Sequence, residues 1–249
     1  MMIVLYGSGI TRDDRIRELV TVFNLFNKEL KLMHDFPYLY SLRNCPFAMR
    51  ARLAIYKSAQ PVFIREVDLR NKPSAMLIDS PKATVPILVV SQSLIIEESL
   101  EVMLWSLAQN DPQNLLRHND DIKFDDILTL IYRFDHGFKS ALEDYKCAKR
   151  YHENNVSEQR SVCEIFINEL DQRLGCHQYV MDEQESLADI AILPFVRQFA
   201  RVERKWYVQS PYPNVKRWLN SYLQHAIFSK VMTQFPCWQT GDAPLIYSA

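Results

Sequence analysis

The sequence predicts an α/β domain over residues 36–108, followed by an all-helical domain over residues 109–249. In the first part, short β-rich runs alternate with amphipathic stretches, as expected when strands and helices pack on one another. From about Gln109 onward, apolar residues recur at helical spacing and only three of the five glycines remain. Asn110-Asp111-Pro112 indicates a linker at this change of pattern, because proline and Asx residues break helices.

Residues 1–35 precede the predicted α/β domain. Between Asp13 and Met33, apolar residues stand at the spacing of one helix face: Ile16, Leu19, Val20, Phe23, Phe26 and Leu30. The extension is interpreted either as a regulatory or oligomer-forming element or as an adaptor helix that covers apolar surface. The adaptor interpretation is favoured.

Cys45 is the first candidate for chemistry. It lies between a short apolar run, residues 36–42, and an amphipathic stretch, residues 47–56, so it is expected at a helix N-terminus. Unpaired backbone N–H groups and the helix dipole favour a thiolate at such a position. The alternative is an ordinary thiol that acts as a small buried hydrophobe. Arg50 and Arg52, further along the same helix, are expected to be solvated surface charges.

A second group of signals lies 39 to 54 residues after Cys45. The β-rich run Thr84–Leu88 contains Pro86, which would cost a hydrogen bond in a central strand and therefore indicates a special turn. After a turn come a short strand at residues 94–96 and a helix that starts at Glu97-Glu98-Ser99. The serine hydroxyl and the N–H groups at that helix start are suited to bind a carboxylate.

With these motifs in place, residues 36–108 resemble the thioredoxin-like N-terminal domain of a cytosolic glutathione transferase, most closely the omega class. The resemblance is carried, in chain order and without insertion, by Cys45-Pro46-Phe47-Ala48, Asn71-Lys72-Pro73, Val85-Pro86 and Glu98-Ser99. Each motif alone is weak, and the four together are specific. The resemblance implies a cis-proline beside the catalytic cysteine, an all-helical glutathione-transferase C-terminal domain and a homodimer.

The resemblance also implies a set of site residues, with Cys45 as the catalytic residue. The implied glutathione-binding residues are Phe47, Lys72, Val85, Pro86, Glu98 and Ser99. Lys72 would bind the glycyl carboxylate, and Val85 would pair in β-fashion with the cysteinyl peptide. Glu98 would take the ammonium group and Ser99 the γ-glutamyl carboxylate, which leaves Cys45 facing the glutathione sulfur.

A cysteine in this place favours thiol–disulfide chemistry. Ala48 stands where a two-cysteine motif would have its second thiol, so the implied cycle uses Cys45 alone and passes through a mixed disulfide with glutathione. The implied activity is that of a thiol transferase or reductase, including dehydroascorbate reduction, on a small electrophilic or disulfide substrate. Two alternatives stay open: conjugation of electrophiles with Cys45 only orienting glutathione, and a non-catalytic interaction module.

Composition limits the classes of protein to which the chain can belong. The chain has 249 residues, 48% of them hydrophobic, and a net charge of −1, so it carries no basic footprint for nucleic acid or an anionic membrane surface. No apolar run approaches the length of a membrane span or a signal peptide, so a cytoplasmic protein is expected. The five cysteines are widely spaced and odd in number, which predicts neither a disulfide framework nor a metal site.

Four helical segments are predicted in the second domain: residues 120–145, 158–174, 187–208 and 213–224. Ser186 and Asp189 stand at the spacing of a capping box, in which a serine and a carboxylate satisfy exposed N–H groups at a helix start. A similar motif in glutathione transferases has a role in folding, so Asp189 is not counted as catalytic.

Overall fold

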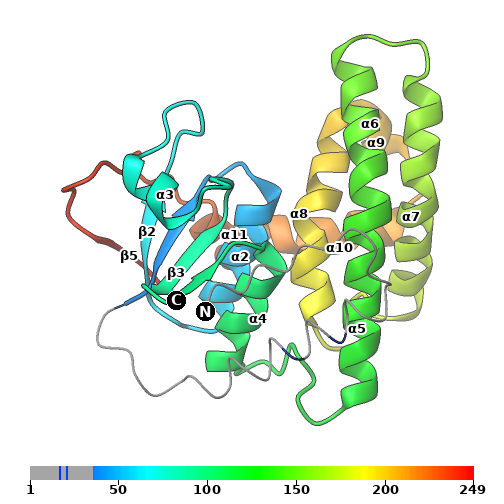
Figure 1. Ribbon diagram of the computed structural model, residues 1–249. Coiled ribbons are helices and arrows are strands. Elements are labelled where there is room, and N and C mark those ends of the chain that lie inside the picture. Colours follow the sequence, from blue (N-terminus) through cyan, green and yellow to red (C-terminus); the bar gives the residue numbers. More distant parts are fainter. Residues whose placement is uncertain (1–16, 18–20, 22–35) are drawn as a thin grey trace. The chain divides into compact units, whose positions relative to one another are not determined.

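A computed structural model of the chain describes residues 36–249, together with Arg17 and Thr21 (Figure 1). The helix predicted between Asp13 and Met33 lies outside the described residues. The described residues up to Gln113 form one compact unit with Ala226–Ala249, and Asn114–His225 form a second. The first unit is α/β and the second is helical, which confirms the predicted fold class.

The first unit is built on a five-stranded mixed sheet in the order β4-β3-β1-β2-β5 (Figure 1). Only β1 and β2 run parallel; the other neighbouring strands are antiparallel. The strands are β1 (Tyr38–Ser41), β2 (Val62–Glu66), β3 (Ile87–Ser91), β4 (Leu94–Ile96) and β5 (Leu245–Tyr247). The helices of this unit are α2 (Pro46–Lys57), α3 (Ser74–Asp79), α4 (Ser99–Gln109) and α11 (Ala226–Val231).

The alternation of side chains along β1 produces two cores, one on each face of the sheet. Leu39 lies in a cluster with Ile55 of α2 and Val102 of α4. Tyr40, the next residue, lies in a cluster with Met76 of α3 on the opposite face. The α2 and α4 helices therefore cover one face and the short α3 covers the other.

The end of the chain departs from the predicted domain extent of 109–249. Residues 226–249 belong to the α/β unit, because β5 pairs antiparallel with β2 at the edge of the sheet. Tyr247 of this strand is buried, and its hydroxyl donates to the Arg52 carbonyl oxygen over 3.1 Å. The partner strand β2 lies far earlier in the chain, so local pattern did not reveal β5.

The prediction that Arg52 is a solvated charge is wrong. Its side chain is fully buried (0% exposed) and forms an ion pair with Glu66 of β2. It also donates to the Ser41 hydroxyl (2.7 Å) and to the carbonyl oxygens of Val231 (3.2 Å) and Thr233 (3.3 Å). These acceptors satisfy a charge that burial would otherwise penalise strongly, and they attach the C-terminal segment to the first unit.

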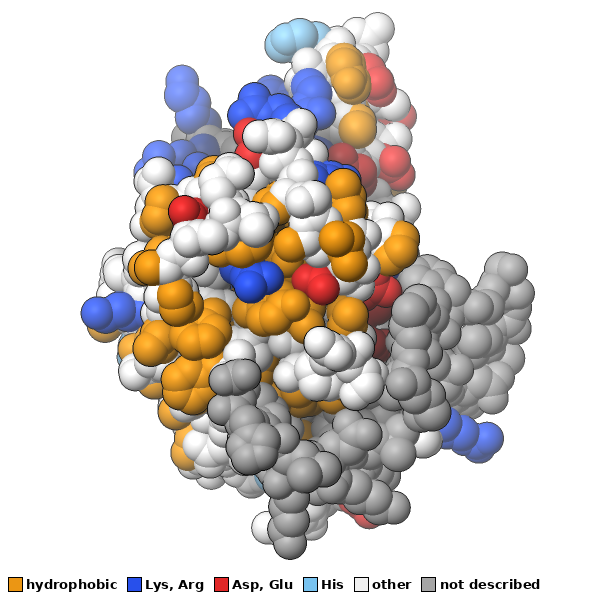
Figure 2. All heavy atoms as spheres, turned by 60° about the vertical axis from the view of Figure 1, so that its left-hand side comes forward, with side chains coloured by type: hydrophobic (Ala, Val, Ile, Leu, Met, Phe, Trp, Pro, Cys, Tyr) orange, Lys and Arg blue, Asp and Glu red, His pale blue; other side chains and the backbone are white. Residues whose placement is uncertain are grey.

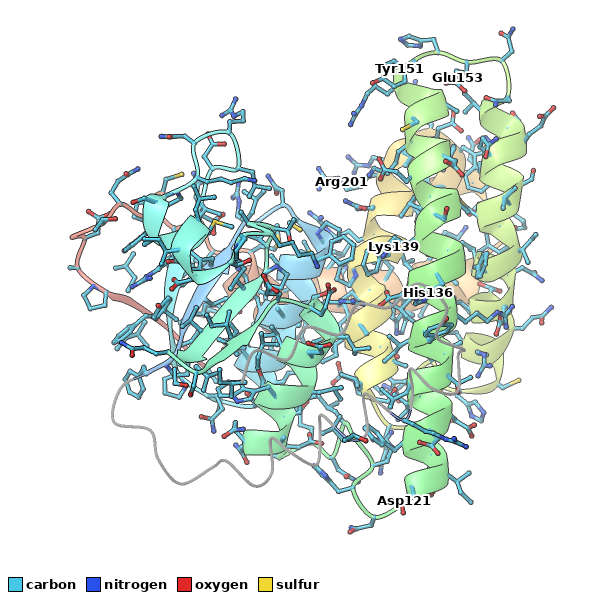
Figure 3. All side chains as sticks on the ribbon, in the orientation of Figure 1. Asp121, His136, Lys139, Tyr151, Glu153 and Arg201 are labelled. Atoms are coloured by element: carbon cyan, nitrogen blue, oxygen red, sulfur yellow. The ribbon has the colours of Figure 1, made fainter. Side chains whose placement is uncertain are left out.

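The second unit is an all-helical bundle. Its elements are α5 (Asp121–Arg133), a π-helical turn η1 (Phe134–Phe138), α6 (Lys139–Arg150), α7 (Val156–Cys176), α8 (Leu187–Val202), α9 (Arg204–Gln209) and α10 (Pro213–Gln224). The first three form one continuous rod, with Asp121 at one end, His136 midway and Tyr151 just beyond the other end (Figure 3). The rod runs past the predicted end at Tyr145, whereas the predicted bounds of α10 are confirmed.

The predicted capping box at the start of α8 is confirmed, since Ser186 is the N-cap and Asp189 closes the box. Asp189 is fully buried and also accepts hydrogen bonds from the Val180 backbone N–H (2.9 Å) and the Trp218 indole N–H (3.0 Å). One carboxylate thus joins the start of α8 to the preceding loop and to α10.

Candidate active site

Cys45 stands at the N-cap of α2, as the sequence predicts. Its backbone is extended, its carbonyl accepts from the Met49 N–H over 2.9 Å, and Pro46 takes the first helical position, where no N–H is needed. The half-buried thiol donates to the carbonyl oxygen of Val85 over 3.7 Å. The Val85–Pro86 peptide bond is cis. The structure thus brings Cys45 into contact with Val85, the residue whose backbone was predicted to pair with the cysteinyl peptide.

The thiolate expected at Cys45 is opposed by burial. Desolvation raises the pKa of the Cys45 thiol above its ordinary value, because the charged form loses more from burial than the neutral form. Backbone N–H groups of Ala48 and Phe47 act in the opposite direction, as the helix-end argument requires. So do the guanidinium groups of Arg50 and Arg52, yet the balance stays upward. The sequence prediction therefore identified the lowering influences and missed the larger raising one.

Alkylation of Cys45 by iodoacetamide, without glutathione, should accelerate about tenfold per pH unit from pH 7 to pH 9, because only the growing thiolate fraction reacts. The rate is measured for the Cys45 peptide by mass spectrometry. The half-buried Cys147 on α6 serves as the internal reference. A plateau below about pH 8 would mean that the helix end outweighs burial.

Ser99 is the first residue of α4 and is buried. Its hydroxyl oxygen accepts a hydrogen bond of 2.8 Å from Nε of Arg50, which lies on α2. Arg50 is itself only 3% exposed, so the prediction that it is a solvated charge is wrong as well. The guanidinium also lies against the ring of Phe47, 5.6 Å from its centroid. The buried Arg50 guanidinium thus contacts the Ser99 hydroxyl, which was predicted to bind a carboxylate. Its positive charge favours an anion at that position.

Glu98 is the N-cap of α4 and forms an ion pair with Lys82, which lies in the loop between α3 and β3. Sequence reasoning missed Lys82, because a lysine 16 residues from its partner gives no local signal. Lys72 is exposed, and the structure gives it no hydrogen bond or ion pair with any described residue. The structure therefore links Lys72 to none of the other predicted site residues that it describes.

The site lies within the first unit and joins the starts of α2 and α4 to the loop before β3. It offers the Cys45 thiol, the backbone ahead of the cis-proline, the Glu98 carboxylate and the Ser99 hydroxyl, which accepts a hydrogen bond from a guanidinium. Across the described ranges, no three His, Cys, Asp or Glu side chains are grouped to hold a metal ion. Within the same residues, no helix has the length and apolar character needed to cross a membrane.

Two family models match the chain. One, described as the N-terminal domain of glutathione S-transferase, matches residues 39–115, and the other, described as its C-terminal domain, matches residues 153–221. Together they cover more than half of the chain. No curated protein sequence matches it.

Solved structures share the fold. A glutathione transferase family member from Pseudomonas fluorescens, with two glutathione molecules bound, has a TM-score of 0.69 and 16% identity and covers 83% of this chain and 97% of its own. Glutathione transferase F2 from Populus trichocarpa has a TM-score of 0.66 and 16% identity, with 79% and 97% coverage. A glutathione S-transferase bound to lactoylglutathione has a TM-score of 0.66 and 18% identity, with 80% and 99% coverage.

Proposed function

Because the chain belongs to the glutathione S-transferase family, we propose that it is an omega-like thiol transferase that uses Cys45 as its only nucleophile. The observation that carries the proposal is the position of the Cys45 thiol, at the N-cap of α2 and 3.7 Å from the Val85 carbonyl oxygen. Ala48 leaves no resolving thiol three residues further on. The cytoplasmic location and the homodimer are part of this proposal.

The proposed cycle has two exchanges. The Cys45 thiolate attacks the glutathione sulfur of a mixed disulfide; the Cys45–glutathione disulfide forms, the old S–S bond breaks, and the substrate leaves as a thiolate that takes up a proton. The thiolate of a second glutathione then attacks the bound glutathione sulfur. Oxidised glutathione leaves and the Cys45 thiolate is restored, so each cycle consumes one free glutathione and converts the mixed disulfide into the free substrate thiol and oxidised glutathione.

The binding roles follow from the groups present. We assign the cysteinyl peptide of glutathione to the Val85 backbone ahead of Pro86, and the γ-glutamyl carboxylate to Ser99. Glu98 would receive the ammonium group, in competition with its ion-pair partner Lys82. Lys72 would reach the glycyl carboxylate from its exposed position, and Phe47 would lie beside the bound tripeptide.

A coupled assay with glutathione, glutathione reductase, NADPH and hydroxyethyl disulfide tests the proposed reaction. Sustained NADPH consumption that depends on the protein supports thiol transfer. Conjugation is the second candidate, because the raised pKa of Cys45 suits a thiol that donates a hydrogen bond to bound glutathione thiolate. Activity with chlorodinitrobenzene and none with the disulfide would replace the first proposal by the second.

Ser99→Ala should weaken glutathione binding by about 1.5–3 kcal/mol, or roughly tenfold to a hundredfold in Kd, since one hydrogen bond to a charged group is lost. Isothermal titration with glutathione measures the change. Ser106→Ala is the matched control, because Ser106 is a buried serine of the same helix whose hydroxyl donates to the Val102 carbonyl oxygen of that helix (2.8 Å). Equal affinity in the Ser99 variant and the wild type would remove Ser99 from the binding site.

A further inference from the structure

The first unit holds a groove that the proposed glutathione site does not use. It has a volume of about 470 Å³ and lies between β1 and β2, α3 and the C-terminal segment around Trp238. This size falls within the roughly 300–1,000 Å³ of small-molecule pockets. None of the residues that line it belongs to the candidate active site. Figure 2 shows this side of the protein, where hydrophobic side chains form a broad patch with few charges among them.

Arg65 of β2 is the cation of the groove, and aromatic rings hold it in place. Its guanidinium carbon lies 3.6 Å from the ring centroid of Tyr38 and 4.1 Å from that of Trp238. Its Nη1 donates to the Tyr40 hydroxyl over 2.9 Å. Cation–π contacts with these rings, together with the hydrogen bond to Tyr40, restrain the guanidinium and so preorganise its N–H groups.

No described carboxylate forms an ion pair with Arg65, although Asp79 and Asp242 both line the groove. Asp79 of α3 accepts hydrogen bonds at its Oδ2 from the hydroxyls of Tyr38 (3.2 Å) and Tyr40 (2.9 Å). Asp242 accepts from the backbone N–H of Gln239 over 2.7 Å. Across the described part of the chain, Arg65 forms no ion pair, and its hydrogen-bond partners are the hydroxyls of Tyr40 and Tyr38. The two carboxylates already have donors, whereas the guanidinium pairs with no described carboxylate.

We propose that this groove binds a small organic anion with a planar apolar body, whose carboxylate pairs with Arg65. A guanidinium restrained in this way matches a carboxylate through two parallel N–H···O bonds. The apolar body of the ligand would lie against Phe63, which lines the groove, and Ile78, whose side chain is 81% exposed. Burial of that exposed side chain supplies the apolar part of the affinity. The site depends on the C-terminal segment, because Trp238 contributes one of the rings that contact the Arg65 guanidinium.

Isothermal titration of the full chain with naphthoate tests the proposal, with S-methylglutathione present at saturation to occupy the glutathione site. Wild-type protein should bind naphthoate at one site and bind the neutral naphthamide about tenfold or more weakly. Arg65→Gln should lose about tenfold or more in naphthoate affinity and nothing in naphthamide affinity. Arg70→Gln is the matched control, because Arg70 is exposed, follows β2 closely and pairs with Asp68 outside the groove.

Three results would overturn the proposal: no naphthoate binding by the wild type, equal binding by Arg65→Gln, or naphthoate binding that occurs only when S-methylglutathione is left out. The titration involves no turnover and is repeated with Cys45→Ser. Unchanged naphthoate binding in that variant keeps this site separate from the proposed function, so each of the two can fail alone.

Discussion

Cys45→Ser should lower glutathione-dependent reduction of hydroxyethyl disulfide by about two orders of magnitude or more. A serine hydroxyl is not ionised at neutral pH and cannot form a mixed disulfide, so both exchanges of the proposed cycle are lost. The change replaces one sulfur by oxygen at a half-buried N-cap position, where serine is a favoured residue. Folding should therefore be retained, and the thermal midpoint of the variant shows whether it is.

Cys147→Ser is the matched control for this experiment. Cys147 is also a half-buried thiol, and its only described partner is Glu143 on the same helix, 3.9 Å away. The control variant should keep wild-type turnover. Wild-type turnover in Cys45→Ser would exclude Cys45 from the mechanism, and loss of activity in both variants would show that the assay reports thiol loss in general.

Asp189→Ala should lower the free energy of unfolding by about 3–5 kcal/mol, because it leaves several buried donors without an acceptor. The donors are the Val180 N–H (2.9 Å), the Ser186 N–H (2.9 Å) and hydroxyl (2.8 Å), and the Trp218 indole N–H (3.0 Å). Urea unfolding followed by circular dichroism measures the loss.

Asp125→Ala on α5 is the control, since Asp125 is an exposed aspartate of the same helical unit. It should change stability by no more than about 0.5 kcal/mol. If the Asp189 variant were as stable as this control, the network around the capping box would contribute nothing to the fold. Glutathione affinity of the folded fraction should stay at the wild-type value, because Asp189 lies outside the unit that carries the candidate site.

Features that depend on contacts between close neighbours in the chain were predicted well. The N-cap position of Cys45, the capping box of Ser186 and Asp189 and the bounds of α10 each depend on residues within about four positions. The strand at Leu94–Ile96 and the start of the helix at Ser99 were predictable for the same reason. The change from an α/β to an all-helical pattern also follows from local periodicity, so the fold class could be predicted.

Features that depend on distant contacts were decided by the tertiary structure. Arg50 and Arg52 look like ordinary surface charges in sequence, yet their acceptors lie 11 to 181 residues away along the chain. The strand β5 exists because it pairs with the edge of β2, which lies far earlier in the chain. The pKa of Cys45 was predicted with the wrong sign, because a helix end can be inferred from neighbouring residues but burial cannot.

The sequence by itself therefore determined the fold class, the helix starts and the position of the reactive thiol, all of which rest on short-range patterns. The tertiary structure alone decided which charges are buried, which carboxylate pairs with Lys82 and where the groove around Arg65 lies. The physical reason is that desolvation and long-range pairing depend on which surfaces the folded chain brings together, and local periodicity carries no information on that.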